Sequence, residues 1–117
     1  MVRTPTHESV TVSEVIANLP ISAEATTSRV VVDTPAIRVV VFAMDAGQEL
    51  TDHSAPRAVV VQVLSGLVDF SYGGSRSQLG AGDVVYLAPG ERHAVVATAP
   101  CHFALTLVDL APAASSP

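Results

Sequence analysis

Two stretches of the sequence decide the fold, and each leads from a glycine to a histidine. The first reads Gly47-Gln-Glu-Leu-Thr-Asp-His53-Ser-Ala55-Pro-Arg-Ala-Val59-Val-Val-Gln-Val-Leu-Ser-Gly66. The second reads Gly82-Asp83-Val-Val-Tyr-Leu-Ala88-Pro89-Gly90-Glu-Arg-His93. Both contain β-branched residues bounded by glycine and proline turn signals, which is typical of the short strands of a sandwich or barrel.

The alternation of strand and turn signals continues over most of the chain. Segments rich in β-branched or aromatic residues are Arg29–Asp33, Ile37–Met44, Ala58–Leu64, Leu67–Tyr72, Ser75–Leu79, Asp83–Leu87, His93–Ala97 and His102–Asp109. Between two of them, Gly73 and Gly74 predict a two-residue hairpin, because glycine supplies the positive φ that such turns require. Short strands at this spacing favour an all-β barrel over βαβ units.

One helix is expected before the strands. Thr11 and Glu14 have the spacing of a capping box, and apolar residues recur on one face up to Leu19. The sequence therefore predicts a short helix at Val12–Leu19. The expected organisation is an N-terminal arm at 1–10, a barrel domain at 11–110 and a disordered tail at 111–117.

Length and composition restrict the class of protein. A chain of 117 residues makes one domain. Hydrophobic residues form 49% of it and charged residues 15%, which excludes intrinsic disorder. Apolar runs such as Val39–Ala43 are far shorter than the ~20 residues of a membrane-spanning helix. No apolar signal core is present near Met1, so we expect a cytoplasmic protein without a membrane partner.

Charge and cysteine content exclude further classes. Six arginines, no lysine and a net charge of −5 supply no basic face for nucleic acid. A single cysteine, Cys101, excludes an internal disulfide and a cysteine-based zinc site. It is interpreted as a small buried thiol.

Together the two stretches resemble the paired signatures of the cupin superfamily, a large group of small jelly-roll barrels. Six positions match those signatures: Gly47, His53, Gly66, Gly82, Gly90 and His93. The resemblance covers about residues 37–108. It implies an all-β, cupin-type antiparallel β-barrel, here preceded by the short helix and arm.

The departures from the signatures concern the metal ligands. In metal-binding cupins, three histidines and one glutamate converge on a divalent transition metal. Here Ala55 occupies the second histidine position and Val59 the glutamate position. The resemblance therefore implies only His53 and His93 as ligands for Zn, Fe, Mn or Ni, with a third group unidentified.

The resemblance also implies a ligand site in the barrel lumen. The candidate ligand-binding residues are His53, His93, Ala55, Val59, Arg57 and Tyr86. The leading interpretation is a barrel that binds a small molecule. Two alternatives stay open: a divergent metalloenzyme, dioxygenase- or isomerase-like, and a metal-free isomerase or cyclase with a lumen histidine as general base.

Other residues suggest structural roles. The segment at 58–64 is apolar on both faces, which favours a homodimer in which one face is a subunit interface. Asp83 is expected to accept backbone N–H bonds of its turn. His102 is expected at the surface or at an interface.

Overall fold

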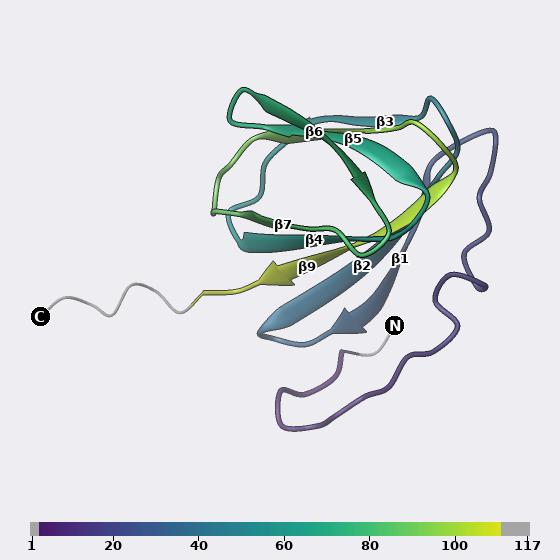
Figure 1. Ribbon diagram of the computed structural model, residues 1–117. Coiled ribbons are helices and arrows are strands. Elements are labelled where there is room, and N and C mark those ends of the chain that lie inside the picture. The colour runs from purple at the N-terminus through teal and green to yellow at the C-terminus, as the bar shows by residue number, and fades with distance from the viewer. Residues whose placement is uncertain (1–2, 111–117) are drawn as a thin grey trace, which may run out of the picture.

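The computed structural model describes residues 3–110, without the side chain of Asp52. Over this range the chain forms nine strands in two antiparallel sheets that face each other (Figure 1). One sheet has the order β1-β2-β9-β4-β7 and the other β3-β8-β5-β6. The strands are β1 Thr27–Asp33, β2 Ile37–Met44, β3 Glu49–His53, β4 Ala58–Ser65, β5 Leu67–Tyr72, β6 Ser75–Gly80, β7 Val84–Leu87, β8 His93–Ala97 and β9 Cys101–Val108.

The observed strands confirm most of the strands predicted from the sequence. Eight of the nine were expected with small differences at their ends, and β5 and β6 meet in the expected hairpin. Its two glycines have φ of 56° at Gly73 and 78° at Gly74. Strand β3 was missed, because Glu-Leu-Thr-Asp-His contains one apolar residue and gives no alternating signal.

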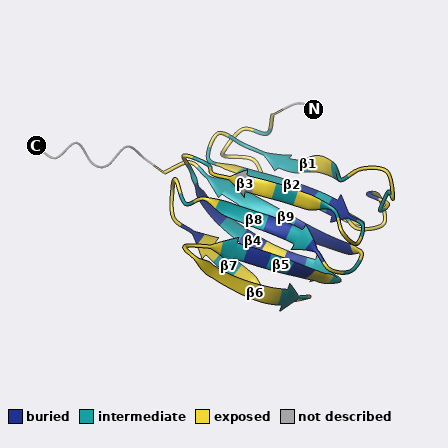
Figure 2. Ribbon diagram, turned by 90° about the horizontal axis from the view of Figure 1, so that it is seen from above, coloured by how far each residue is buried: buried dark blue, intermediate teal, exposed yellow. Residues whose placement is uncertain are grey.

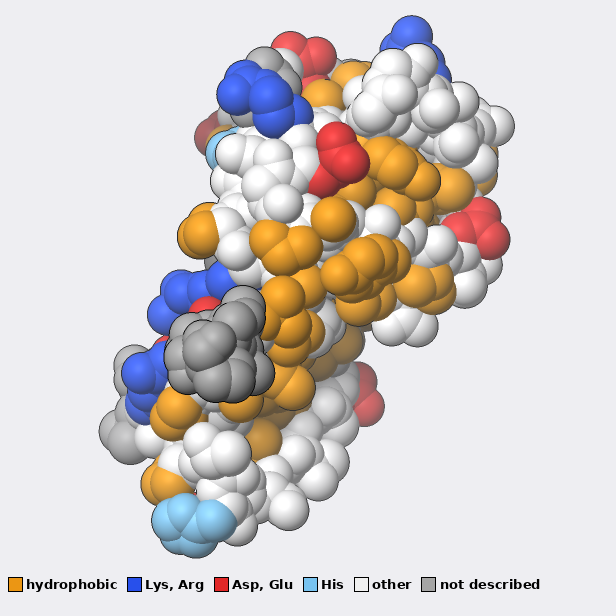
Figure 3. All heavy atoms as spheres, turned by 90° about the vertical axis from the view of Figure 1, so that its left-hand side faces the viewer, with side chains coloured by type: hydrophobic (Ala, Val, Ile, Leu, Met, Phe, Trp, Pro, Cys, Tyr) orange, Lys and Arg blue, Asp and Glu red, His pale blue; other side chains and the backbone are white. Residues whose placement is uncertain are grey.

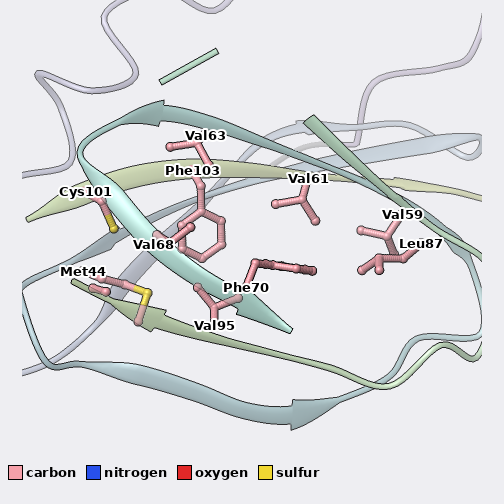
Figure 4. Packing of buried hydrophobic residues seen from close by; sticks show 11 residues of the cluster. Met44, Val59, Val61, Val63, Val68, Phe70, Leu87, Val95, Cys101 and Phe103 are labelled. Atoms are coloured by element: carbon pink, nitrogen blue, oxygen red, sulfur yellow. The ribbon is translucent and has the colours of Figure 1, made fainter. Parts of the chain in front are cut away.

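The space between the sheets is an apolar core (Figure 4). Buried residues from both sheets meet there: Met44, Val59, Val61, Val63, Val68, Phe70, Leu87, Val95, Ala97, Cys101 and Phe103. On β4, Val61 and Val63 point inward while Gln62 between them is exposed, the two-residue period of a strand with one face in the core. Each buried Val, Leu or Phe contributes about 1.5–3 kcal/mol. Edge strand β6, by contrast, is exposed along most of its length (Figure 2).

The predicted helix at Val12–Leu19 does not form, and the described residues contain no helix. Glu14 has a φ of 59°, in the left-handed region that a right-handed helix cannot contain. One isolated turn remains, in which Asn18 N–H donates to the Glu14 carbonyl at 3.0 Å. Nucleating so short a helix is unfavourable, and this segment is held instead by contacts with the sheet.

Those contacts cover part of the outer face of the five-stranded sheet. Leu19 packs against Val41 and Ala43, the buried outward-facing residues of β2. Val15 and Ile21 pack around this second cluster. Leu64, at the end of the segment that suggested a subunit interface, packs against the same cluster, so part of that apolar outer face is covered by the chain itself.

His102 anchors the same segment, so its expected position at the surface was wrong. The residue is 5% exposed, and its Nε2–H donates to the Leu19 carbonyl at 2.7 Å. A one-residue shift in the pairing of β4 with β9 places Ser65 opposite His102. The Ser65 hydroxyl lies 3.1 Å from Nδ1 of His102 and accepts its backbone N–H at 3.0 Å. Both ring nitrogens are thus satisfied away from the lumen.

Two further expectations concern the C-terminal tail and membrane-spanning segments. The predicted tail at 111–117 lies outside the described residues. Within residues 3–110, no helix could cross a membrane.

A substitution at Gly66, between β4 and β5, tests how closely the backbone approaches itself where the chain passes from one sheet to the other. Its φ is 77°, and a Cβ there would lie 2.7 Å from Cys101 Cα and still closer to the Pro100 carbonyl oxygen. We expect Gly66→Ala to lower the free energy of unfolding by at least about 3 kcal/mol, because backbone atoms must move. Chemical denaturation of both proteins measures this difference.

Gly74→Ala is the matched control. Gly74 has nearly the same φ, 78°, but a Cβ there meets nothing within 4 Å. Its free energy of unfolding should fall only by the cost of placing alanine in the left-handed conformation, about 1–2 kcal/mol. Equal destabilisation of the two variants would contradict the close approach at Gly66.

Candidate functional site

Strands β3 and β8 bring His53 and His93 together. The two residues are direct partners in the antiparallel pairing, and their ring centroids lie 6.4 Å apart with the planes tilted by 35°. Partners in register project to the same side of a sheet, which here is the lumen. The two imidazoles thus line the same cavity as neighbours on paired strands, and their expected role as ligand-binding residues stays a prediction.

A β-bulge gives His53 this direction. Between Leu50 and His53, β3 contains one more residue than the matching part of β8. On a regular strand, residues three apart point to opposite faces. The bulge reverses the alternation, so that both Leu50 and His53 face the lumen, as bulges beside functional sites often do.

The two histidines lie at one end of a cavity of about 250 Å³. Its lining residues are Phe42, Leu50, His53, Ser54, Ala55, Val59, His93, Val95, Phe103, Leu105 and Leu107. Phe42 and Phe103 stack in parallel with centroids 5.1 Å apart. All the polar side chains come from residues 53, 54 and 93, so the remaining wall is apolar. Figure 3 looks onto the end of the barrel where β3 leads to β4, and hydrophobic side chains form a band there.

The ring of His93 is held from two sides. Its Nδ1–H donates to the Glu91 carbonyl at 3.2 Å, because a carbonyl oxygen can only accept. Its face stacks on the buried Phe70, with centroids 5.8 Å apart and planes within 11°. His53 is the more exposed of the pair.

The two signature loops are fastened to each other at this end. Gly90 N–H donates to the Ala55 carbonyl at 2.7 Å, which links the turn before β8 to the loop after β3. Farther along, the Asp83 carboxylate accepts the Gly80 N–H at 2.8 Å, the turn-capping role expected from the sequence. The bond between Gly90 and Ala55 fixes the two loops from which residues 55 and 93 enter the site.

Two candidate lumen residues lie elsewhere. Arg57 Nε is 2.9 Å from Asp109 Oδ1, an ion pair near the end of β9, and Arg57 does not line the cavity. Tyr86 is 61% exposed and pairs with the outward-facing Val60. Its position within the second signature suggested a place in the lumen, but the parity of β7 directs it outward.

Cys101 is the small buried thiol that the sequence indicated. It is inaccessible, and burial raises the pKa of its thiol, against a smaller lowering by a hydrogen bond with the Met44 backbone. Its neighbour His102 faces the opposite side of β9, so the two do not form a nucleophile–base pair.

Seven lining residues were not among the candidate ligand-binding residues, namely Phe42, Leu50, Ser54, Val95, Phe103, Leu105 and Leu107. The alternation of Phe103, Leu105 and Leu107 along β9 could have identified three of them. Leu50 could not be placed, because its strand and the bulge were both unrecognised.

Comparison with known proteins agrees with this arrangement. Residues 36–114 match the model of the AraC-like ligand binding domain. The chain belongs to this family. This chain is therefore an AraC-like ligand-binding domain with a cupin-type fold.

Three solved structures illustrate the likeness of this AraC-like domain to others. A protein of unknown function from Streptococcus pyogenes is 25% identical, with a TM-score of 0.79 over 96% of this chain and 98% of that chain. A double-stranded β-helix protein from Klebsiella pneumoniae is 25% identical, with a TM-score of 0.75 over 86% and 90%. A cupin superfamily protein from Desulfitobacterium hafniense is 11% identical, with a TM-score of 0.76 over 80% and 86%. Curated proteins give no match.

The donor set of this AraC-like domain does not fit the metal centre of metal-binding cupins. Ala55 and Val59 line the cavity at the two missing ligand positions. No three His, Cys, Asp or Glu side chains among those described come close enough to hold a metal ion. Sites of the cupin type need at least three protein ligands.

Restoring the missing ligands tests this interpretation. We expect Ala55→His combined with Val59→Glu to create Zn²⁺ or Ni²⁺ binding, because both positions face the lumen beside the histidine pair. Calorimetry should detect at least tenfold tighter binding than in the natural chain. Val60→Glu alone, which places a carboxylate on the outer face and leaves only two histidines in the lumen, is the control and should bind metal no better than the natural chain. Stoichiometric metal retained by the natural chain would contradict the interpretation.

Proposed function

We propose that the lumen binds one small, mainly apolar molecule whose single polar group faces His53 and His93. The observation that carries this proposal is the distribution of polarity in the cavity, where the polar side chains meet at one end and the rest is apolar. Convergence of a few polar groups on an apolar pocket is the usual form of a small-ligand site. A volume of about 250 Å³ suits a ligand near the lower end of the usual size range.

The same distribution disfavours a sugar or another polyol as ligand. Such a molecule carries hydroxyl groups on most of its carbon atoms, and burying each hydroxyl without a hydrogen-bond partner costs about 1–3 kcal/mol of binding free energy. Leu105, Leu107 and the Phe42–Phe103 stack offer no side-chain partner. Ligands with one polar group are therefore favoured over ligands with several.

Each of the two enzyme alternatives requires a feature that the binding proposal does not. A metalloenzyme needs a third ligand beside His53 and His93, and the described side chains supply none. A metal-free isomerase or cyclase needs a substrate whose acidic proton reaches a lumen histidine. The binding proposal needs neither a metal nor a reaction.

Indole is a suitable probe, because the chain contains no tryptophan that would mask its fluorescence. We expect indole emission to shift to shorter wavelength on titration with the protein, with Kd between about 10 μM and 1 mM for so small a ligand. Val59→Phe should weaken binding at least tenfold, since the ring fills the lumen. Fluorescence titration measures both values.

Val60→Phe is the control, because residue 60 follows in the same strand and faces outward. It should bind indole as the natural chain does. If Val59→Phe binds equally well, or if the natural chain does not bind indole, the proposal is wrong.

The homodimer stays a prediction. The outer face of β7 offers Val84 and Tyr86, which are 59% and 61% exposed and lie beyond the area covered by the N-terminal segment. A self-complementary apolar face of this kind is what an isologous dimer uses. Sedimentation equilibrium determines whether the chain associates.

A further inference from the structure

We infer that the molecule bound in the lumen donates a hydrogen bond from its polar group to Nε2 of His93. This inference rests on the proposed function and narrows its ligand to molecules with one hydroxyl or N–H on an apolar frame. It excludes ethers, N-alkylated rings and carboxylates as preferred ligands.

The tautomer of His93 carries the inference. Nδ1 lies 3.2 Å from the Glu91 carbonyl, which accepts only, so Nδ1 bears the proton. A neutral imidazole then has its lone pair on Nε2. His93 lines the lumen and thus offers an acceptor at Nε2, and a bound molecule that cannot donate would leave this acceptor without a partner.

The acceptor is also fixed in orientation. Phe70, a buried residue of β5, stacks on the imidazole within 11° of parallel. The carbonyl of Glu91 is itself positioned by the turn before β8, in which Glu91 N–H donates to the Ala88 carbonyl at 3.1 Å. Exchange of the two ring nitrogens by a 180° flip would leave the ring in the plane of the stack but break the hydrogen bond to the Glu91 carbonyl.

His53 complements this acceptor. Its ring centroid lies 6.4 Å from that of His93, and its exposure leaves it free to donate from either nitrogen. An oxygen or nitrogen about 2.8 Å from one nitrogen of each ring is compatible with this separation. A hydroxyl can therefore donate to His93 and accept from His53, while an N–H group makes the first bond only.

Three indoles of nearly equal shape separate donation from size. Indole and 3-methylindole keep the ring N–H, whereas 1-methylindole carries the same added methyl but has no donor. We expect the first two to bind the natural chain at least tenfold more tightly than 1-methylindole, since a buried acceptor left unpaired costs about this much. Fluorescence titration of all three probes gives the ratios.

Two variants assign the effect to one imidazole. His93→Phe keeps an aromatic ring against Phe70 but removes the acceptor, so its three Kd values should agree within about threefold. His7→Phe is the control, because the His7 side chain is 83% exposed and distant in sequence from the site. It should keep the preference for N–H donors.

The outcomes separate this inference from the proposed function. If all three probes bind the natural chain alike, or if both methylated probes weaken equally, donation to His93 is wrong and the apolar site stands. If none binds, the proposed function fails and the inference fails with it. The probe series on the natural chain decides these cases even if His93→Phe does not fold.

Discussion

The pairing of β3 with β8 determines what the lumen of this barrel can hold. Its single bulge turns His53 inward beside His93, its direct partner across the two strands. Without that extra residue, the alternation of the strand would direct His53 to solvent and leave one histidine in the site. The chemistry of the site therefore depends on a backbone irregularity in a strand with a single apolar residue.

Polar side chains lie on both sides of the five-stranded sheet, and the sheet separates one group from the other. Inward, β4 and β9 supply valine, leucine and phenylalanine, and polarity enters only where β3 and β8 meet. Outward, the buried His102 is hydrogen-bonded to Ser65 and holds the N-terminal segment at Leu19. Two buried or half-buried histidines thus have unrelated roles. His102 uses both nitrogens within the fold, whereas His93 uses one and presents the other to the lumen.

The sequence predicted the parts of the structure that depend on periodic burial and on glycine turns. Strand β4 was evident from its valines, and the hairpin at Gly73-Gly74 from its glycines. The spacing of the glycines and histidines also indicated the family and placed four of six candidate residues at the cavity.

The errors share a physical cause, because each concerned a residue whose direction is set by tertiary contacts. The capping pattern at Thr11 predicted a helix, but packing of Leu19 on Val41 holds the segment in another conformation. Arg57 and Tyr86 were assigned by proximity to the signatures, yet an ion pair and strand parity direct them outward. Local propensity does not contain this information.

Methyl NMR with indole tests the central claim most directly, because it locates a bound molecule on either face of the same sheet. If the lumen is the binding site, indole shifts the methyl signals of Val59, Leu105 and Leu107 and the ring signals of His93, while those of Val84 on the outer face stay unchanged. Shifts confined to Val84 and Val60 would place the molecule on the exterior of the barrel and contradict the account.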